Sequence, residues 1–167
     1  MPVLATGKNA PLFELASTAG RKFSLKDALA RGPVLAAFFK VSCPVCQYTL
    51  PFVERLYQQF RRAGAENIRV WGISQDDVPS TEKFAKEFGL TFPMLIDEEP
   101  YLTSSDYGLD HVPTLVLISP DGGVEVSGDG FSKSDLLEVR KSLAGQFKVK
   151  PAELFMPSEQ VPAFKPG

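Results

Sequence analysis

The sequence predicts an α/β fold in which helices flank a central mixed β-sheet and an extra β-hairpin stands at the N-terminus. Residues 34–39 are apolar throughout, as expected of a central strand that is covered on both faces. Strand-like segments then alternate with segments whose apolar residues recur at helical spacing. The length of 167 residues, with 44% hydrophobic and 23% charged residues, fits one globular domain with a full core.

The first thirty residues predict the hairpin and a short helix. Residues 11–15 alternate apolar and polar side chains, and residues 20–25 follow a Thr-Ala-Gly turn as the second hairpin strand. Ser24 can cap a short helix over residues 25–29, which Gly32 and Pro33 end.

Beyond the central strand, strands and helices are expected in turn. An amphipathic helix runs from Pro44 to about Arg62, and a final helix, capped by Ser132 or Ser134, reaches residue 147. The intervening segments are strands at 68–74, 93–97, 114–119 and 124–127, with helices at 79–88 and 101–107. Strands that are joined by helices should be parallel, whereas the turn at residues 121–123 adds an antiparallel edge strand.

The chain divides into a domain over residues 1–147 and an arm over residues 148–167. Four prolines prevent a long helix in the arm, but its side chains are too apolar for a segment surrounded by solvent. We therefore expect an extended arm packed on the surface of the domain, with disorder as the alternative.

Net charge and terminal composition limit the partners. The net charge of −2 and the lack of a long basic run give no reason to expect nucleic acid or a membrane as a partner. The first residues show no signal peptide, and no apolar stretch approaches the ~20 residues that a membrane helix needs. A cytoplasmic protein is expected, where a reducing environment favours dithiols over structural disulfides.

Cys43 and Cys46 are the candidate reactive residues. They stand two residues apart where the apolar strand passes into the amphipathic helix, with Cys43 at the cap and Pro44 at the first helical position. A helix N-terminus offers unpaired N–H groups and a positive dipole end, which favour a thiolate. A Cys-x-x-Cys pair in a strand–helix context is typical of a redox-active dithiol.

Three other interpretations of the cysteine pair stay open. A structural disulfide would close so short a loop that it restricts the unfolded chain little. Half of a zinc site would lack further ligands, because the sequence has two Cys and a single His, His111. Two unrelated buried thiols are the third interpretation, since free Cys is often buried.

The cysteine pair recurs with other motifs in a recognisable order. Phe38-Phe39 precedes Cys43-Pro44-Val45-Cys46, and Val112-Pro113-Thr114 and Ser119-Pro120-Asp121-Gly122 follow far downstream. With these motifs, residues 7–147 resemble the redoxin branch of the thioredoxin superfamily, which includes TlpA/ResA-like thiol–disulfide oxidoreductases and the peroxiredoxins (AhpC/TSA). The resemblance implies a thioredoxin-like fold and a role in redox homeostasis or antioxidant defence.

The resemblance also assigns the surroundings of the cysteines. Pro113 matches a proline that is cis in the superfamily and lies against the two sulfurs. Val112 would then present a backbone edge that holds substrate by strand-like hydrogen bonds, with Pro44 and Val45 completing the substrate-binding surface. No cofactor and no metal are implied.

The chain departs from the family patterns near the site. Ser42 replaces the usual Trp before the first Cys, and the acids that relatives place near the second Cys would fall at Ala37 and Thr49. Lys40 and His111 are possible modulators of the thiols. Glu14, Asp76 or a water molecule could replace the missing acid.

The predicted function is that of a thiol–disulfide oxidoreductase. Cys43 and Cys46 would exchange disulfides with a protein or a small thiol substrate, and an external thiol reductant, such as a thioredoxin and its reductase, would regenerate the dithiol. A peroxiredoxin-like thiol peroxidase is an alternative, although Phe39, Cys43 and the Val112–Pro113 region lack that family's Pro, Thr/Ser and Arg. A non-catalytic redox-sensing or binding module is the other alternative.

Overall fold

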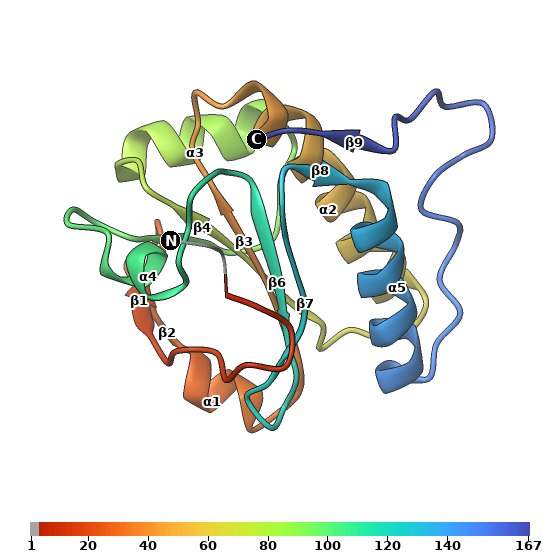
Figure 1. Ribbon diagram of the computed structural model, residues 1–167, viewed down its shortest axis with the longest axis horizontal. Coiled ribbons are helices and arrows are strands. Elements are labelled where there is room, and N and C mark those ends of the chain that lie inside the picture. Colours follow the sequence, from red (N-terminus) through yellow and green to blue (C-terminus); the bar gives the residue numbers. More distant parts are fainter. Residues whose placement is uncertain (1–3) are drawn as a thin grey trace.

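The computed structural model describes residues 4–167, which form a central five-stranded sheet in the order β5-β4-β3-β6-β7 (Figure 1). The middle strand, β3 (Val34–Phe39), pairs with β4 (Arg69–Ser74) on one side and with β6 (Thr114–Ile118) on the other. The two edges are β5 (Met94–Ile96) and β7 (Val124–Asp129). The predicted α/β fold with a mixed sheet is confirmed.

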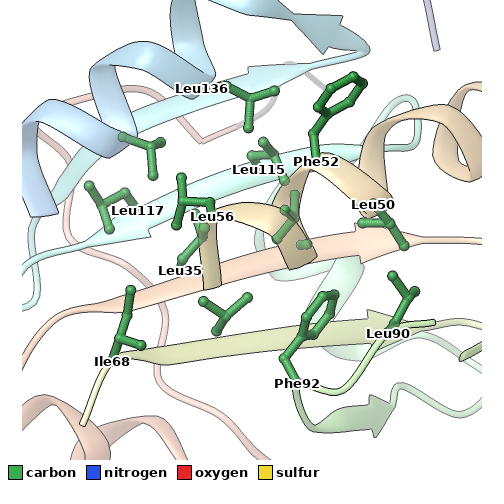
Figure 2. Packing of buried hydrophobic residues seen from close by; sticks show 14 of the residues in the cluster. Leu35, Leu50, Phe52, Leu56, Ile68, Leu90, Phe92, Leu115, Leu117 and Leu136 are labelled. Atoms are coloured by element: carbon green, nitrogen blue, oxygen red, sulfur yellow. The ribbon is translucent and has the colours of Figure 1, made fainter. Parts of the chain in front are cut away.

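Helices cover both faces of the sheet because β3 is apolar on both sides. Leu35, Ala37 and Phe39 belong to one cluster of buried side chains, and Val34, Ala36 and Phe38 belong to another. Apolar side chains of three helices pack in the first cluster, part of which Figure 2 shows: α2 (Pro44–Arg62), α3 (Val78–Glu87) and α5 (Lys133–Phe147).

The opposite face is covered by the shorter elements of the chain. The predicted N-terminal hairpin is present as β1 (Glu14–Ala16) paired with β2 (Lys22–Ser24). Side chains of α1 (Leu25–Leu29) pack in the second cluster, as does Tyr107, which follows α4 (Leu102–Asp106). Ser24 caps α1 as the sequence predicts, because its hydroxyl accepts the amide N–H of Asp27.

The expected direction of β6 is wrong. We predicted that strands joined by helices would be parallel, and this holds for β3, β4 and β5, but β6 runs antiparallel to β3. The connection to β6 contains only the five-residue helix α4. Such a helix advances about 8 Å, whereas a parallel return must span a strand of about 20 Å. The chain therefore enters β6 from the end at which β5 finishes.

The arm after α5 returns to the domain. Leu154 is fully buried in the core, and β9 (Phe164–Lys165) pairs antiparallel with β8 (Phe131–Ser132). In Figure 1 the arm loops away from α5 and comes back beside β8, so that its end lies near the start of α2.

No helix within residues 4–167 is both long and apolar enough to cross a membrane.

Candidate active site

Cys43 is the residue that caps α2, at the carboxyl end of the central strand. The amide N–H of Cys46 donates to Cys43 Sγ across 3.1 Å, so the first helical turn points a free donor at the sulfur. This position agrees with the general placement of sites at the carboxyl ends of strands in open α/β sheets. The helix N-terminus therefore gives Cys43 Sγ both a hydrogen bond and the positive end of the helix dipole.

Two side chains hold the loop between β3 and α2. The carboxylate of Asp76 accepts the amide N–H of Val41 across 2.8 Å, and the amide group of Gln47 donates to the carbonyl oxygen of Val41 across 3.0 Å. Since one contact comes from beyond β4 and the other from α2, the loop that carries Cys43 is fixed from two sides.

The two thiols are free and differ in exposure. Cys46 is fully buried, whereas Cys43 is partly exposed. Burial raises the pKa of the Cys46 thiol well above its ordinary value, and the hydrogen bond with Cys43 raises it further. The nearby charge of Lys40 lowers the pKa of Cys46, but this effect is smaller than that of burial. Cys46 is therefore a protonated thiol at neutral pH, and Cys43 is the sulfur that a substrate can reach.

The backbone of Val112 lies against Cys43. The Cys43 thiol donates to the carbonyl oxygen of Val112 across 3.5 Å, and the Val112–Pro113 peptide bond is cis. Thr114 fixes the preceding turn, because its hydroxyl donates to the carbonyl oxygen of His111 across 2.7 Å. The motif far downstream in the sequence is thus brought to the sulfur, as expected.

A hollow of about 400 Å³ opens next to Cys43. Pro44, Lys40 and His111 line it and are themselves exposed, so three predicted site residues share one surface with the sulfur. The remaining lining residues are Gln75, Leu109, Asp110, Val112 and Gly167.

Other residues from the sequence prediction do not line the hollow, among them Pro113, Val45 and Glu14. Val45 is half-buried and packs against the core, so it supports the start of the helix instead of lining the opening. Glu14 lies on the N-terminal hairpin, where it faces Lys22 at 3.7 Å. The charge that acts on Cys46 from outside the cysteine pair comes from Lys40.

Sequence reasoning missed Gln47, the structural role of Asp76, and Gly167. Gln47 lies one residue beyond the motif, and nothing in the local sequence distinguishes it from an ordinary helix-forming residue. Asp76 was considered as a proton acceptor, but the structure has its carboxylate bound to the loop backbone. Gly167 is more than fifty residues from any other lining residue, and no local pattern connects it with the cysteines.

The sequence matches the model of the AhpC/TSA family over residues 6–127, which include both cysteines and Pro113. The chain belongs to the AhpC/TSA family. Among curated members of similar sequence, the thiol-disulfide oxidoreductase ResA of Geobacillus thermodenitrificans is 32% identical over 141 residues, which cover 84% of this chain and 79% of that protein. ResA of Bacillus subtilis is 28% identical over 121 residues, or 72% of this chain and 65% of that protein.

Solved structures of the same fold come from proteins with different names. The thioredoxin domain of thiol-disulfide oxidoreductase BVU-2223 from Bacteroides vulgatus has a TM-score of 0.71 at 22% identity, and the match covers 84% of this chain and 98% of that one. Peroxidoxin BcpB from Mycobacterium tuberculosis has a TM-score of 0.69 at 23% identity, over 88% and 99%. These likenesses establish the thioredoxin-like fold of this AhpC/TSA member.

The described residues also bear on the zinc interpretation. In residues 4–167, no group of three or more His, Cys, Asp and Glu side chains is placed to hold a metal ion together. The half-site that the cysteine pair would provide gains no further ligands in this part of the chain.

Proposed function

We propose that this protein is a thiol–disulfide oxidoreductase in which Cys43 attacks and Cys46 resolves. One observation carries the proposal: a partly exposed sulfur caps a helix and receives an N–H at 3.1 Å, while its partner three residues later is fully buried. The exposed sulfur can meet a substrate, and the buried one can meet only Cys43. This division of roles agrees with the name that the ResA relatives carry.

The reaction transfers two electrons from the protein to the substrate. The Cys43 thiolate attacks one sulfur of a substrate disulfide, forms a mixed disulfide and releases the other substrate sulfur as a thiolate. Cys46 then loses its proton and attacks Cys43 Sγ, which forms the Cys43–Cys46 disulfide and releases the second substrate thiolate. Protons from solvent convert both products to thiols.

Regeneration requires a dithiol reductant from outside the chain. Two electrons and two protons from that reductant convert the Cys43–Cys46 disulfide back to the two thiols. A thioredoxin-type protein with its reductase would supply them to Cys43, which is the partly exposed sulfur of the pair.

The surroundings of Cys43 favour disulfide exchange over peroxide reduction. Peroxide cleavage needs donors that stabilise the charge developing on oxygen. Among residues 4–167, the hollow beside Cys43 is lined by Lys40 and His111 but by no arginine. The family's peroxidase helpers are also missing from the sequence at Phe39 and at Cys43 itself.

Reduction of glutathione disulfide, driven by dithiothreitol or by thioredoxin and its reductase, tests the proposal. We expect catalysis by the natural chain and none by Cys43→Ser, because no second accessible thiol can start the attack. Peroxide consumption is measured on the same two proteins. Rapid peroxide consumption by Cys43→Ser, with no disulfide reduction by either protein, would contradict the proposal and favour a peroxidase that uses Cys46.

A further inference from the structure

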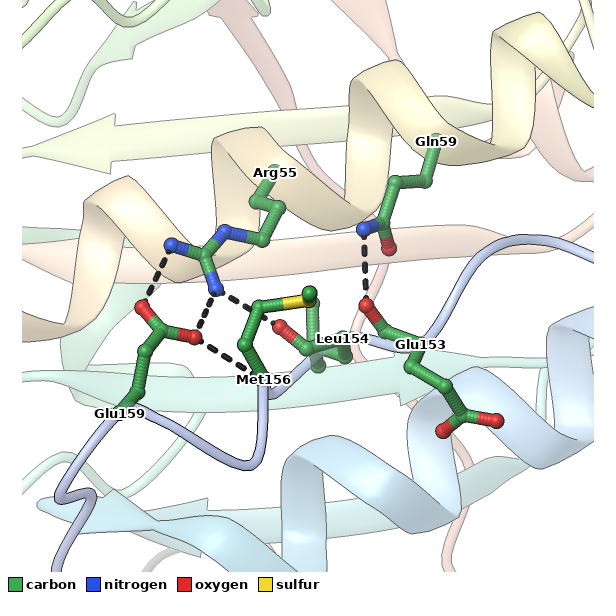
Figure 3. Close-up of polar contacts among 6 residues, drawn as sticks. All are labelled: Arg55, Gln59, Glu153, Leu154, Met156 and Glu159. Atoms are coloured by element: carbon green, nitrogen blue, oxygen red, sulfur yellow. Dashed lines mark hydrogen bonds and ion pairs between the residues drawn. The ribbon is translucent and has the colours of Figure 1, made fainter.

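Polar contacts hold the C-terminal arm to α2, the helix that begins at the cysteine pair. Arg55 forms a two-pronged ion pair with Glu159, at 2.7 and 2.9 Å, and also donates to the carbonyl oxygen of Leu154 across 2.9 Å (Figure 3). Gln59, one turn later, donates to the carbonyl oxygen of Glu153 across 3.0 Å. The middle of the arm is thus fastened directly to the helix that positions Cys43.

The end of the arm lies against the first turns of the same helix. Lys165, in β9, places its ammonium group 5.0 Å from the ring centre of Tyr48, which follows Cys46 by two residues. Gly130 makes room for this strand, because a Cβ at Gly130 would overlap the carbonyl oxygen of Lys165. Gly130 in turn donates its N–H to the carbonyl oxygen of Pro113 across 2.8 Å.

Gly167 contacts the carbonyl group of Val112, which also accepts a hydrogen bond from Cys43. A Cβ at Gly167 would overlap the carbonyl oxygen of Val112, so the backbone of Gly167 lies directly against that group. The same oxygen accepts the Cys43 thiol at 3.5 Å. Gly167 therefore contacts the group to which Cys43 is hydrogen-bonded, and it lines part of the hollow.

We propose that residues 164–167 select the substrate: they cover the Val112 side of Cys43 and restrict the site to low-molecular-weight disulfides. This inference rests on the proposed oxidoreductase function. A hollow of about 400 Å³ has the size of a small-molecule site. An extended polypeptide that approached along Val112 would meet Gly167 first and would have to displace it.

Only the fraction of protein in which the arm is displaced can accept a polypeptide disulfide. The apparent affinity for such a substrate falls in proportion to that fraction, whereas a small disulfide that enters the hollow with the arm in place is unaffected. The arm therefore acts on the ratio of two rates and not on the chemistry of Cys43.

The test compares two substrates in matched glycine variants. Gly167→Ala adds one methyl group where it must push the end of the arm away from Val112, and Gly145→Ala adds the same group in α5 where nothing lies within 4 Å. A second variant, Lys165→Glu/Gly167→Ala, also removes the cation from the Tyr48 ring. Reduction of insulin and of glutathione disulfide is measured for all of them and for the natural chain.

In the arm variants we expect the rate of insulin reduction, divided by the rate of glutathione disulfide reduction, to rise about threefold to tenfold. This is about the factor by which the loss of one or two weak contacts changes an equilibrium constant. Gly145→Ala should keep the natural ratio. An unchanged ratio in the double variant, or an equal change of both rates, would overturn the inference and leave the proposed function standing. Failure of the natural chain to reduce either disulfide would overturn both.

Discussion

At the scale of single residues, exposure decides which cysteine does which step. Cys43 and Cys46 are three residues apart, yet the helix turns the first toward the hollow and the second into the core. The backbone N–H of Cys46 donates a hydrogen bond to Cys43 Sγ, so the buried residue also contributes to the reactivity of the exposed one. The sequence analysis could assign these roles because a helix cap and its third residue have fixed relative positions.

The first prediction concerns the acidity of Cys46. Burial raises the pKa of Cys46, and the raised value lies above neutral pH, so the thiol stays protonated until the pH exceeds its ordinary pKa. In Cys43→Ser, where Cys46 is the remaining thiol, the alkylation rate by iodoacetamide should still be rising with pH above the free-thiol value of about 8.5. A midpoint at or below that value would show that the core does not hold Cys46 neutral.

The sequence alone did not identify the group that accepts the proton of Cys46. Patterns in the sequence, compared with the family, place the usual acids at Ala37 and Thr49, neither of which is acidic. They did not show that Asp76 is bound to the backbone of Val41, because that contact joins two loops through tertiary packing.

At the scale of elements, α2 links the core, the cysteines and the arm. Its apolar side packs in the larger core cluster, its first turn carries the reactive pair, and its exposed side binds residues 153–159. Changes along this helix should therefore separate into effects on stability, on chemistry and on the arm, according to which side they touch.

The second prediction concerns the buried side of α2. Leu56 is fully buried, so Leu56→Ala removes packed methyl groups and leaves a cavity. We expect a loss of about 2–5 kcal/mol in the free energy of unfolding, measured by urea denaturation. Leu137→Ala is the matched control, because Leu137 on α5 is 40% exposed and should cost well under half as much. Equal losses would mean that Leu56 does not pack as described.

The third prediction concerns the Arg55–Glu159 ion pair. The hydrogen bond from Arg55 holds the pKa of Glu159 at about 2, below its ordinary value of 4.5. A depressed pKa stabilises the folded chain above the ordinary value, and this stabilisation is lost as the pH falls from 4.5 toward 2. Thermal unfolding followed through this window should show a steeper loss for the natural chain than for Glu159→Gln. Parallel curves would indicate that the ion pair does not form.

Element order was predictable, but the direction of β6 was not. Apolar runs, caps and turn residues identified each strand of the central sheet and the helices between them, since these signals are local. The direction of β6 depends on how far the short helix α4 carries the chain, which is a property of the packed molecule. The pairing of β9 with β8 likewise joins segments more than thirty residues apart.

At the scale of the whole molecule, the fold brings three distant parts of the chain to one sulfur. The cysteine pair comes from the strand–helix junction, Val112 and Pro113 from the turn before β6, and Gly167 from the end of the arm. The sequence itself predicted the first, the resemblance to the redoxin branch predicted the second, and the third lies beyond residues 6–127 that match the AhpC/TSA family. The arm lies outside the residues that match the family model.

The fourth prediction concerns the order of the two cysteines in the reaction. Cys43→Ser should form no adduct with a disulfide substrate, because Cys46 is buried and protonated. Cys46→Ser should form the mixed disulfide and keep it, because the sulfur that would release the substrate is gone. Both variants change one atom at the site, so circular dichroism spectra like that of the natural chain should accompany either result.

The most direct test of the account is the intact mass of Cys46→Ser after exposure to glutathione disulfide. The account predicts a gain of one glutathione, bound through Cys43 and released by dithiothreitol, while Cys43→Ser under the same conditions keeps its original mass. Absence of the adduct on Cys46→Ser, or its appearance on Cys43→Ser instead, would contradict the assignment of Cys43 as the attacking thiol.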